Sequence, residues 1–223
     1  MPIPYDWQKW CRECNVPEPE RLHGICLQFF TLLVEANSYV NLTRIADEDG
    51  FWIKHVLDSL LPGKFFPELS TEVFHIADVG CGAGFPSLVL AAAYPKLKVT
   101  AIDSVGKKTK FVESAAKTLG LSNVTVLNGR SPELNRRKEY ENRYDILTAR
   151  AVGDAVKLYT EANHMVKSSG RYLFYKTPEQ AREEISRLQQ LKGKKSGTPV
   201  WSLTDPVELP MNAGSRVFLI GKI

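Results

Sequence analysis

The sequence predicts an α/β protein with a doubly wound, mostly parallel sheet, preceded by a helical extension. Three observations support this prediction. From residue 73 onward, short runs rich in β-branched and aromatic residues alternate with segments of helical periodicity. A glycine-rich turn follows the first of these runs. The last two strand-like runs stand too close together in the chain to be joined by a helical crossover.

Length and composition are those of an ordinary globular protein. The 223 residues suffice for one full α/β domain plus a smaller N-terminal part, and 43% of them are hydrophobic. No apolar run approaches the roughly 20 residues of a membrane span, and the N-terminus lacks the apolar core of a signal peptide. We therefore expect a cytoplasmic protein without a membrane partner, whose four cysteines stay reduced.

Positive charge is modest in amount but clustered. The net charge of +4 permits a polyanionic partner without requiring one. Basic residues gather at 136–138 and at 192–195. Each cluster taken alone is more typical of a solvated loop than of a binding surface.

The N-terminal part is predicted to be helical. Residues 20–36 carry apolar side chains on most turns, as a buried helix does. Asp47 or Asp49 can cap a second helix, which presents an apolar face between Phe51 and Leu60. Two prolines then interrupt the chain before the alternating segment. The predicted parts are a helical cap, 1–70, and a main domain, 71–223.

The main domain is predicted to hold a seven-stranded sheet whose last strand is antiparallel. The expected parallel strands are 74–79, 98–103, 124–128, 144–149 and 171–176. The expected helices between and after them are 86–94, 107–119, 154–167 and 178–191. Two further β-like runs, "PVWSLTD" and "SRVFLIGK", are joined by only nine residues. Since a parallel pair needs a longer crossover, these two should be antiparallel neighbours.

The glycine-rich turn "DVGCGAG", residues 78–84, predicts a cofactor site. Between a strand and a helix, glycines permit a tight turn and let a ligand approach the backbone N–H groups, which points to Gly80 and Gly82 as contacts. No Lys-Ser/Thr pair follows, so a phosphate-binding P-loop is disfavoured. Asp103 ends the next strand, where a carboxylate can accept hydrogen bonds from two ribose hydroxyls.

The spacing of the loop favours S-adenosylmethionine over a dinucleotide. A dinucleotide loop reads G-x-G-x-x-G and leaves room for a pyrophosphate, whereas this one reads G-x-G-x-G. Asp78 stands too close to the loop to favour a pyrophosphate, but it can help to hold a ligand that bears an amino group and a sulfonium. The pattern and the antiparallel end of the sheet resemble the class I, Rossmann-like methyltransferases. Cys81 inside the loop is read as a small buried residue rather than a nucleophile.

Several further blocks narrow the resemblance. In order, they are "VNLTRI", "HVLDSLL", "IADVGCGAGFPSLVLAAAYP", "AIDSVGKKTKFVESAAKTLGL", "NGRSPEL" and "YDILTARAV". Together, over about residues 25–176, they resemble the bacterial 16S ribosomal RNA (guanine-N7)-methyltransferases, the glucose-inhibited division protein B family. The blocks around the glycine loop and "DSVGKKTKFV" are the most specific.

The resemblance implies a set of cofactor contacts. Gly80, Phe85 and Arg150 match the family's cofactor-side positions. Where the family usually reads Gly-Arg-Ala-Glu-Glu, this chain has Ser131 and Pro132 in place of the pair expected beside the adenine. Proline has no N–H to donate and here replaces an acid.

The resemblance also implies the reaction. Guanine N7 has an exposed lone pair, so methyl transfer to it needs alignment and exclusion of water rather than a general base. Positions that match the family and could place the substrate are Asn41, Arg44, His55, Asp58 and Lys176. We read the i, i+3 pair of His55 and Asp58 mainly as a structural hydrogen bond that covers the pocket. Arg150 or Lys176 could instead hold guanine O6 or a phosphate.

The expected function is methyl transfer from S-adenosylmethionine to N7 of a guanine in the decoding-region loop of 16S rRNA. The expected partner is the free RNA, the small ribosomal subunit or an assembly intermediate, and the chain is expected to act as a monomer. Two alternatives stay open: a methyltransferase of the same fold that acts on a small molecule or a protein, and an RNA-binding module that has lost catalysis.

The sequence does not favour a zinc site. Cys11, Cys14, His23 and Cys26 could supply four ligands, but their C-x₂-C-x₈-H-x₂-C spacing fits no common zinc motif. No metal is therefore expected.

Overall fold

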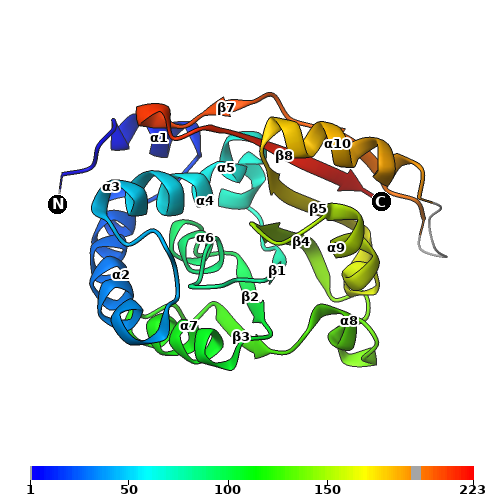
Figure 1. Ribbon diagram of the computed structural model, residues 1–223, viewed down its shortest axis with the longest axis horizontal. Helices are drawn as coiled ribbons and strands as arrows, with labels where there is room; N and C mark the ends of the chain where they lie inside the picture. Colours follow the sequence, from blue (N-terminus) through cyan, green and yellow to red (C-terminus); the bar gives the residue numbers. More distant parts are fainter. Residues whose placement is uncertain (1, 192–196) are drawn as a thin grey trace.

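A computed structural model describes residues 2–191 and 197–223. A single mixed sheet runs through the molecule in the order β3-β2-β1-β4-β5-β8-β6, and a short β7 pairs with β8 (Figure 1). The strands are β1 (His75–Val79), β2 (Lys98–Asp103), β3 (Val124–Asn128), β4 (Tyr144–Arg150), β5 (Val166–Lys176), β6 (Val200–Leu203), β7 (Val207–Glu208) and β8 (Ser215–Lys222).

The sheet confirms the predicted topology. β1 to β5 pair in parallel, whereas β8 is antiparallel to both β5 and β6. The seven-stranded path is as expected, with the two-residue β7 as an addition. β5 begins five residues earlier than predicted, because Val166 already pairs with Tyr144 before a register shift. The strand order reverses at β1, between β2 and β4, and ligands of open α/β sheets bind beyond the strand ends at such a point.

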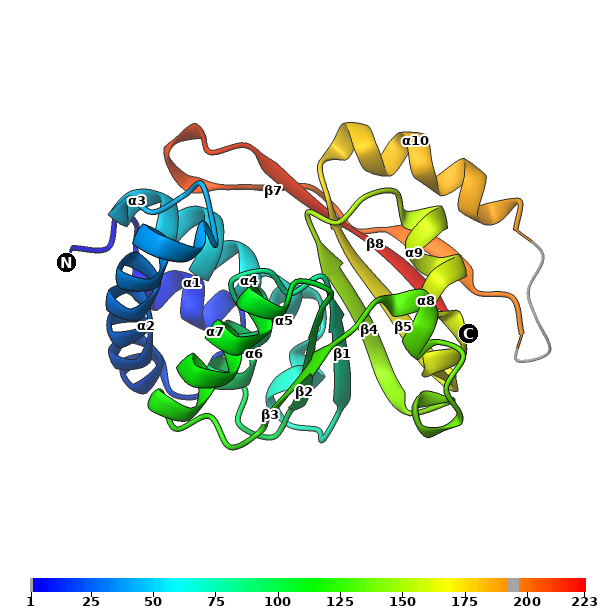
Figure 2. The same ribbon diagram turned by 60° about the horizontal axis from the view of Figure 1, so that its bottom comes forward.

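Helices cover both faces of the sheet (Figure 2). The N-terminal helices pack on one face together with α6 and α7, and α8, α9 and α10 pack on the other. Their bounds are α1 (Trp7–Glu13), α2 (Pro19–Val40), α3 (Glu48–Gly50), α4 (Asp58–Leu60), α5 (Pro62–Phe65), α6 (Ser87–Ala93), α7 (Gly106–Thr118), α8 (Ser131–Leu134), α9 (Ala155–Ala162) and α10 (Pro178–Gln189).

The predicted N-terminal helices form, with one difference. Asp47 is the residue that caps α3, since its side chain accepts from Gly50 N at 2.7 Å. The segment that follows, Phe51–Leu57, is a π-helix rather than the expected α-helix, and it carries His55. Such wider turns are frequent at functional sites. Among the described residues, no helix is both long enough and apolar enough to cross a membrane.

The N-terminal extension shares its core with the sheet. Buried side chains of α2 and of the π-helix belong to one hydrophobic cluster that also includes residues of β1, β2 and β8. Phe29 of α2, for example, stacks on Phe85 with ring centroids 4.9 Å apart. The division at residue 70 stays a prediction.

Candidate cofactor and substrate site

A cavity of about 830 Å³ opens at the carboxyl ends of β1, β2 and β4. Its wall brings together eight of the residues singled out in the sequence: His55, Gly80, Gly82, Phe85, Asp103, Ser131, Pro132 and Arg150. Residues as far apart in the chain as His55 and Arg150 thus meet where the strand order reverses, as the fold class predicts.

The glycine loop has the backbone that its sequence requires. Gly80 has φ +77°, and a Cβ there would come within 2.3 Å of Val152 in the loop after β4. Gly82 has φ +56°, and its Cβ would meet nothing nearer than a backbone oxygen at 4.0 Å. Because Gly82 also lines the cavity, its missing side chain leaves space for a ligand beside the backbone.

Asp103 supports this loop from the end of β2. Its carboxylate accepts from Gly82 N at 3.0 Å and from Val105 N at 2.8 Å. A carboxylate has about four lone-pair directions, so two remain for hydroxyl donors. The arrangement suits a ribose that lies against the loop.

Asp78 does not line the cavity. It is fully buried and accepts a hydrogen bond from Ser87 of α6, so it lies behind the loop rather than at the ligand. Burial raises its pKa to about 6, although the bond from Ser87 opposes the shift. The suggestion that this carboxylate helps to hold the ligand's amino group is therefore not supported.

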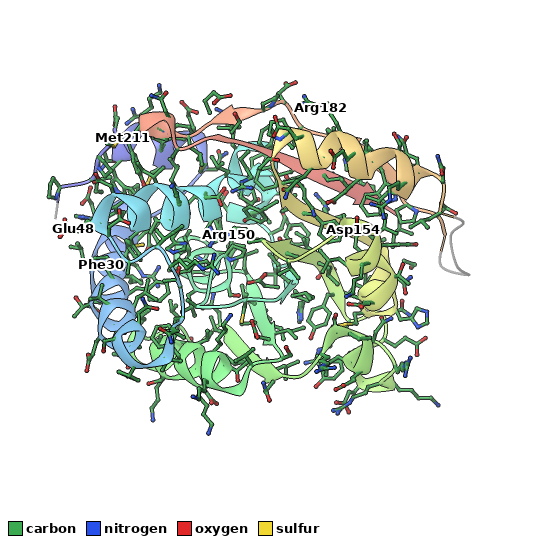
Figure 3. All side chains as sticks on the ribbon, in the orientation of Figure 1. Phe30, Glu48, Arg150, Asp154, Arg182 and Met211 are labelled. Carbon is green, nitrogen blue, oxygen red and sulfur yellow. The ribbon has the colours of Figure 1, made fainter. Side chains whose placement is uncertain are left out.

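Arg150, which is labelled in Figure 3, is the centre of a hydrogen-bond network in the cavity wall. Its Nη1 donates to Lys54 O at 2.7 Å and to Asp58 Oδ2 at 3.0 Å, and its Nη2 lies 3.2 Å from His55 Nδ1. The guanidinium carbon also lies 5.5 Å from the centre of the Phe85 ring. Three of the five N–H donors are thereby engaged, and two remain for a ligand.

His55 is held as a neutral side chain. A guanidinium can only donate, so Nδ1 accepts from Arg150 and the proton of the imidazole is on Nε2. Nε2 lies 3.3 Å from Ile45 O, and the ring stacks on Phe85 at 4.2 Å. Burial and the charge of Arg150 lower the pKa of His55 to about 4.

The predicted bond between His55 and Asp58 is replaced by a shared partner, since Arg150 contacts both side chains. Arg216 of β8, which was not predicted from the sequence, also donates to Asp58, through Nε at 2.6 Å and through Nη2 at 2.9 Å. Asp58 therefore joins two arginines that lie 92 and 158 positions away. No local signal around Arg216 indicates this role.

Lys176 lies outside the cavity, contrary to its assignment as a substrate contact. It is buried and forms an ion pair with Glu184 of α10 at 2.8 Å, and it also donates to Gly153 O at 2.8 Å. Glu184 in turn accepts from Ala155 N at 3.0 Å. The pair thus holds the loop between β4 and α9, whose Val152 packs against Gly80.

Asn41 and Arg44 are exposed and do not line the cavity. Asn41 ends α2 in the left-handed conformation, with φ 55°. The two residues between them, Leu42 and Thr43, do line it. The segment after α2 is thus part of the wall, although the two side chains singled out in the sequence, Asn41 and Arg44, are not.

The thiol groups of the four cysteines lie in the interior of the protein. Cys11, Cys14, Cys26 and Cys81 are free and buried, and burial raises the pKa of each thiol. Within residues 2–191 and 197–223, no three His, Cys, Asp or Glu side chains are close enough together to hold a metal ion. The structure therefore gives no support to the zinc alternative.

One wall of the cavity is formed by α8 and α9. Ser131 and Pro132 begin α8 shortly after β3, and both line the cavity, while their contact with the cofactor stays a prediction. Glu161 of α9 joins them, with Oε2 3.4 Å from Ser131 Oγ. The sequence analysis did not identify Glu161, because an acid on a helix surface carries no distinguishing pattern. The cavity thus offers space, the carboxylate of Asp103 and free donors on Arg150, which fits S-adenosylmethionine.

Comparisons with known proteins identify the family of the chain. Residues 24–201 match the family model described as GidB: rRNA small subunit methyltransferase G. A ribosomal RNA small subunit methyltransferase G of Lactobacillus delbrueckii subsp. bulgaricus is 36% identical over 192 residues, which cover 86% of this chain and 79% of that protein. The same-named protein of Staphylococcus epidermidis is 36% identical over 196 residues, covering 86% and 78%.

Solved structures support the fold. A SAM-dependent methyltransferase from Aquifex aeolicus has a TM-score of 0.53 at 22% identity, over 73% of this chain and 89% of that one. An rRNA methylase from Streptococcus thermophilus has a TM-score of 0.52 at 15% identity, over 73% and 95%. The predicted fold class, family and cofactor are confirmed. The chain belongs to the GidB family of small-subunit ribosomal RNA methyltransferase G proteins.

Proposed function

We propose that the chain transfers a methyl group from S-adenosylmethionine to N7 of a guanine in the decoding-region loop of 16S rRNA. The observation that carries the proposal is the cavity at the strand-order reversal, with Asp103 and the glycine loop on one side and Arg150 on the other. The family of the chain supports the RNA substrate.

The state of His55 is consistent with chemistry that needs no general base. When bound, S-adenosylmethionine supplies a methyl group on a positively charged sulfur. Guanine N7 presents a lone pair without a proton, so no side chain has to remove one. Nδ1 of His55 is occupied by Arg150, and its low pKa keeps the ring neutral at pH 7. The ring serves instead to stack on Phe85 and to close the wall.

Alignment is then the main task of the protein. Holding two reactants in line can lower a barrier by about 7–11 kcal/mol. Asp103 and the loop at Gly82 would orient the nucleoside end of the cofactor, and the two free donors of Arg150 would meet a carboxylate or the guanine edge. Buried aromatic rings at Phe85 and Phe29 exclude water from one side.

Positive side chains at the mouth suit a phosphate backbone. Arg130 and Lys108 line the cavity, and within the described parts of the chain neither has a carboxylate within 4 Å. The basic cluster at 136–138 is exposed nearby in sequence, after α8. The other predicted cluster, 192–195, lies outside the described residues. We expect binding of RNA to weaken as salt concentration rises.

The test is transfer of labelled methyl from S-adenosylmethionine to small-subunit particles taken from cells that lack this protein. The modified base is then identified, and purified 16S rRNA is assayed in parallel. Label at N7 of one guanine supports the proposal, and the better of the two substrates shows whether a particle is needed. Cofactor binding without label in either RNA would overturn the RNA assignment. The expected monomer and the expected cytoplasmic site of action stay predictions.

A further inference from the structure

If Asp103 binds the ribose, the base of the cofactor would lie against the wall beyond it. Gly129 N donates to Asp103 O at 3.0 Å, so the end of β3 and the start of α8 continue directly from the predicted ribose contact. At this point the chain has Pro132, which has neither an N–H to donate nor a carboxylate to accept. Pro132 therefore offers no side-chain acceptor for the exocyclic amino group of adenine.

Glu161 brings a carboxylate to the same wall from another element. Its side chain is 28% exposed, lines the cavity and lies with Oε2 3.4 Å from Ser131 Oγ, which can donate to it. Its other oxygen, Oε1, lies 3.8 Å from Lys157 Nζ, whose side chain is 72% exposed. Such an exposed pair is weak, so Oε1 is available to a stronger donor.

We propose that Glu161 accepts a hydrogen bond from the N6 amino group of the adenine of S-adenosylmethionine, in place of an acid on α8. This assignment rests on the cofactor of the proposed function. Ser131 is the positioning residue, because its hydroxyl bonds to Oε2 of Glu161. The presence of Pro132 where the family usually has an acid then does not indicate a lost cofactor site, because the hydrogen-bond acceptor comes from α9.

The chemistry of the base edge makes the assignment specific. Adenine presents a donor at N6, whereas hypoxanthine presents an oxygen at the same place. A carboxylate attracts the first and repels the second. A site that hydrogen-bonds a substrate N–H also rejects an analogue that lacks it, because the buried partner is left unpaired.

The rival acid is Glu133, which stands next to Pro132 in sequence. Glu133 is exposed and does not line the cavity. It therefore provides the matched control: both acids lie near Pro132, but only Glu161 faces the ligand space.

The experiment measures affinity by isothermal titration calorimetry with the full chain, using S-adenosylhomocysteine and S-inosylhomocysteine. We expect the wild type and Glu133→Ala to prefer the adenine compound by about tenfold or more, the worth of a charge-assisted hydrogen bond. Glu161→Ala should narrow the preference to about threefold or less. Glu161→Gln keeps a side-chain oxygen but removes the charge, so its preference for the adenine compound should be intermediate. If Glu161→Ala fails to fold, the preference of Glu161→Gln tests the assignment.

Two results overturn the assignment while leaving the cofactor in place. One is a wild-type preference retained in both Glu161 variants, and the other is a preference lost in Glu133→Ala. A different failure, in which the wild type binds neither compound, refutes the cofactor of the proposed function and this contact with it.

Discussion

Asp58 offers the sharpest test of how the site is held together. Its side chain is 2% exposed and accepts three hydrogen bonds, one from Arg150 and two from Arg216, at 2.6–3.0 Å. Replacing Asp58 with Asn keeps the shape but removes the charge, and the new amide N–H₂ faces a guanidinium that can only donate. Breaking a buried ion pair in this way costs about 3–5 kcal/mol.

The expected result for Asp58→Asn is a loss of at least about 3 kcal/mol in the free energy of unfolding. For a chain of this size, that lowers Tm by about 6–12 °C. Urea denaturation measures the loss, and calorimetry with S-adenosylhomocysteine should show weaker binding, because Arg150 is no longer anchored. Glu179→Gln is the control, since its pair with Arg182 is exposed and should not shift Tm measurably.

A double-mutant cycle makes the test decisive. Arg216→Met in the Asp58→Asn background should add little, because the partner of Arg216 is already lost. Additive effects of the two substitutions, or a loss below about 1 kcal/mol for Asp58→Asn, would refute the claim that Asp58 anchors both arginines.

Three further predictions concern the loop, the buried lysine and pH. Gly80→Ala should lower the free energy of unfolding by about 1–2 kcal/mol, because of the positive φ, and should also abolish binding of S-adenosylhomocysteine. Gly120→Ala is the control: Gly120 has φ +69° but no atom within 4 Å of a Cβ, so calorimetry should show normal binding. Lys176→Met should lower the free energy of unfolding, measured in urea, by about 3–5 kcal/mol, because it leaves Glu184 buried and unpaired. Adding Glu184→Gln should restore most of this loss, and no recovery would contradict the ion-pair account. The difference in the free energy of unfolding between the wild type and His55→Gln should shrink by up to about 3 kcal/mol as pH falls from 6.5 to 4. A difference that does not change with pH would contradict the lowered pKa of His55.

The direction of the pH effect follows from proton binding. His55 has a folded-state pKa of about 4, below its unfolded value, so the unfolded chain binds more protons between these pH values and the native state loses stability as pH falls. Asp78 acts in the opposite direction, because its folded-state pKa of about 6 lies above the unfolded value. Comparing wild type with His55→Gln cancels the contribution of Asp78, and only the histidine's remains.

The cofactor side of the site was predictable because its determinants are local. The positive φ of Gly80 and the position of Asp103 at a strand end follow from a few neighbouring residues. Strand and helix periodicity likewise predicted β1 to β5 to within a few residues at most ends. The five-residue extension of β5 was missed because it depends on pairing with β4.

The role of each charged side chain depended on contacts between distant elements. Lys176 matches a substrate-binding position in sequence, yet Glu184 of α10 binds it outside the cavity. Arg216 shows no local signal, and only the pairing of β8 with β5 brings it to Asp58.

The sequence by itself thus determined the fold class, the loop and the kind of cofactor, since backbone conformation and periodicity are encoded over short stretches. The tertiary structure alone decided which polar side chains meet: that Arg150 is shared by His55 and Asp58, and that Glu161 lies beside Ser131 in the cavity wall. The physical reason is range, because a hydrogen bond or buried ion pair requires atoms within about 3–4 Å. Only the packing of helices on both faces of the sheet brings such atoms together.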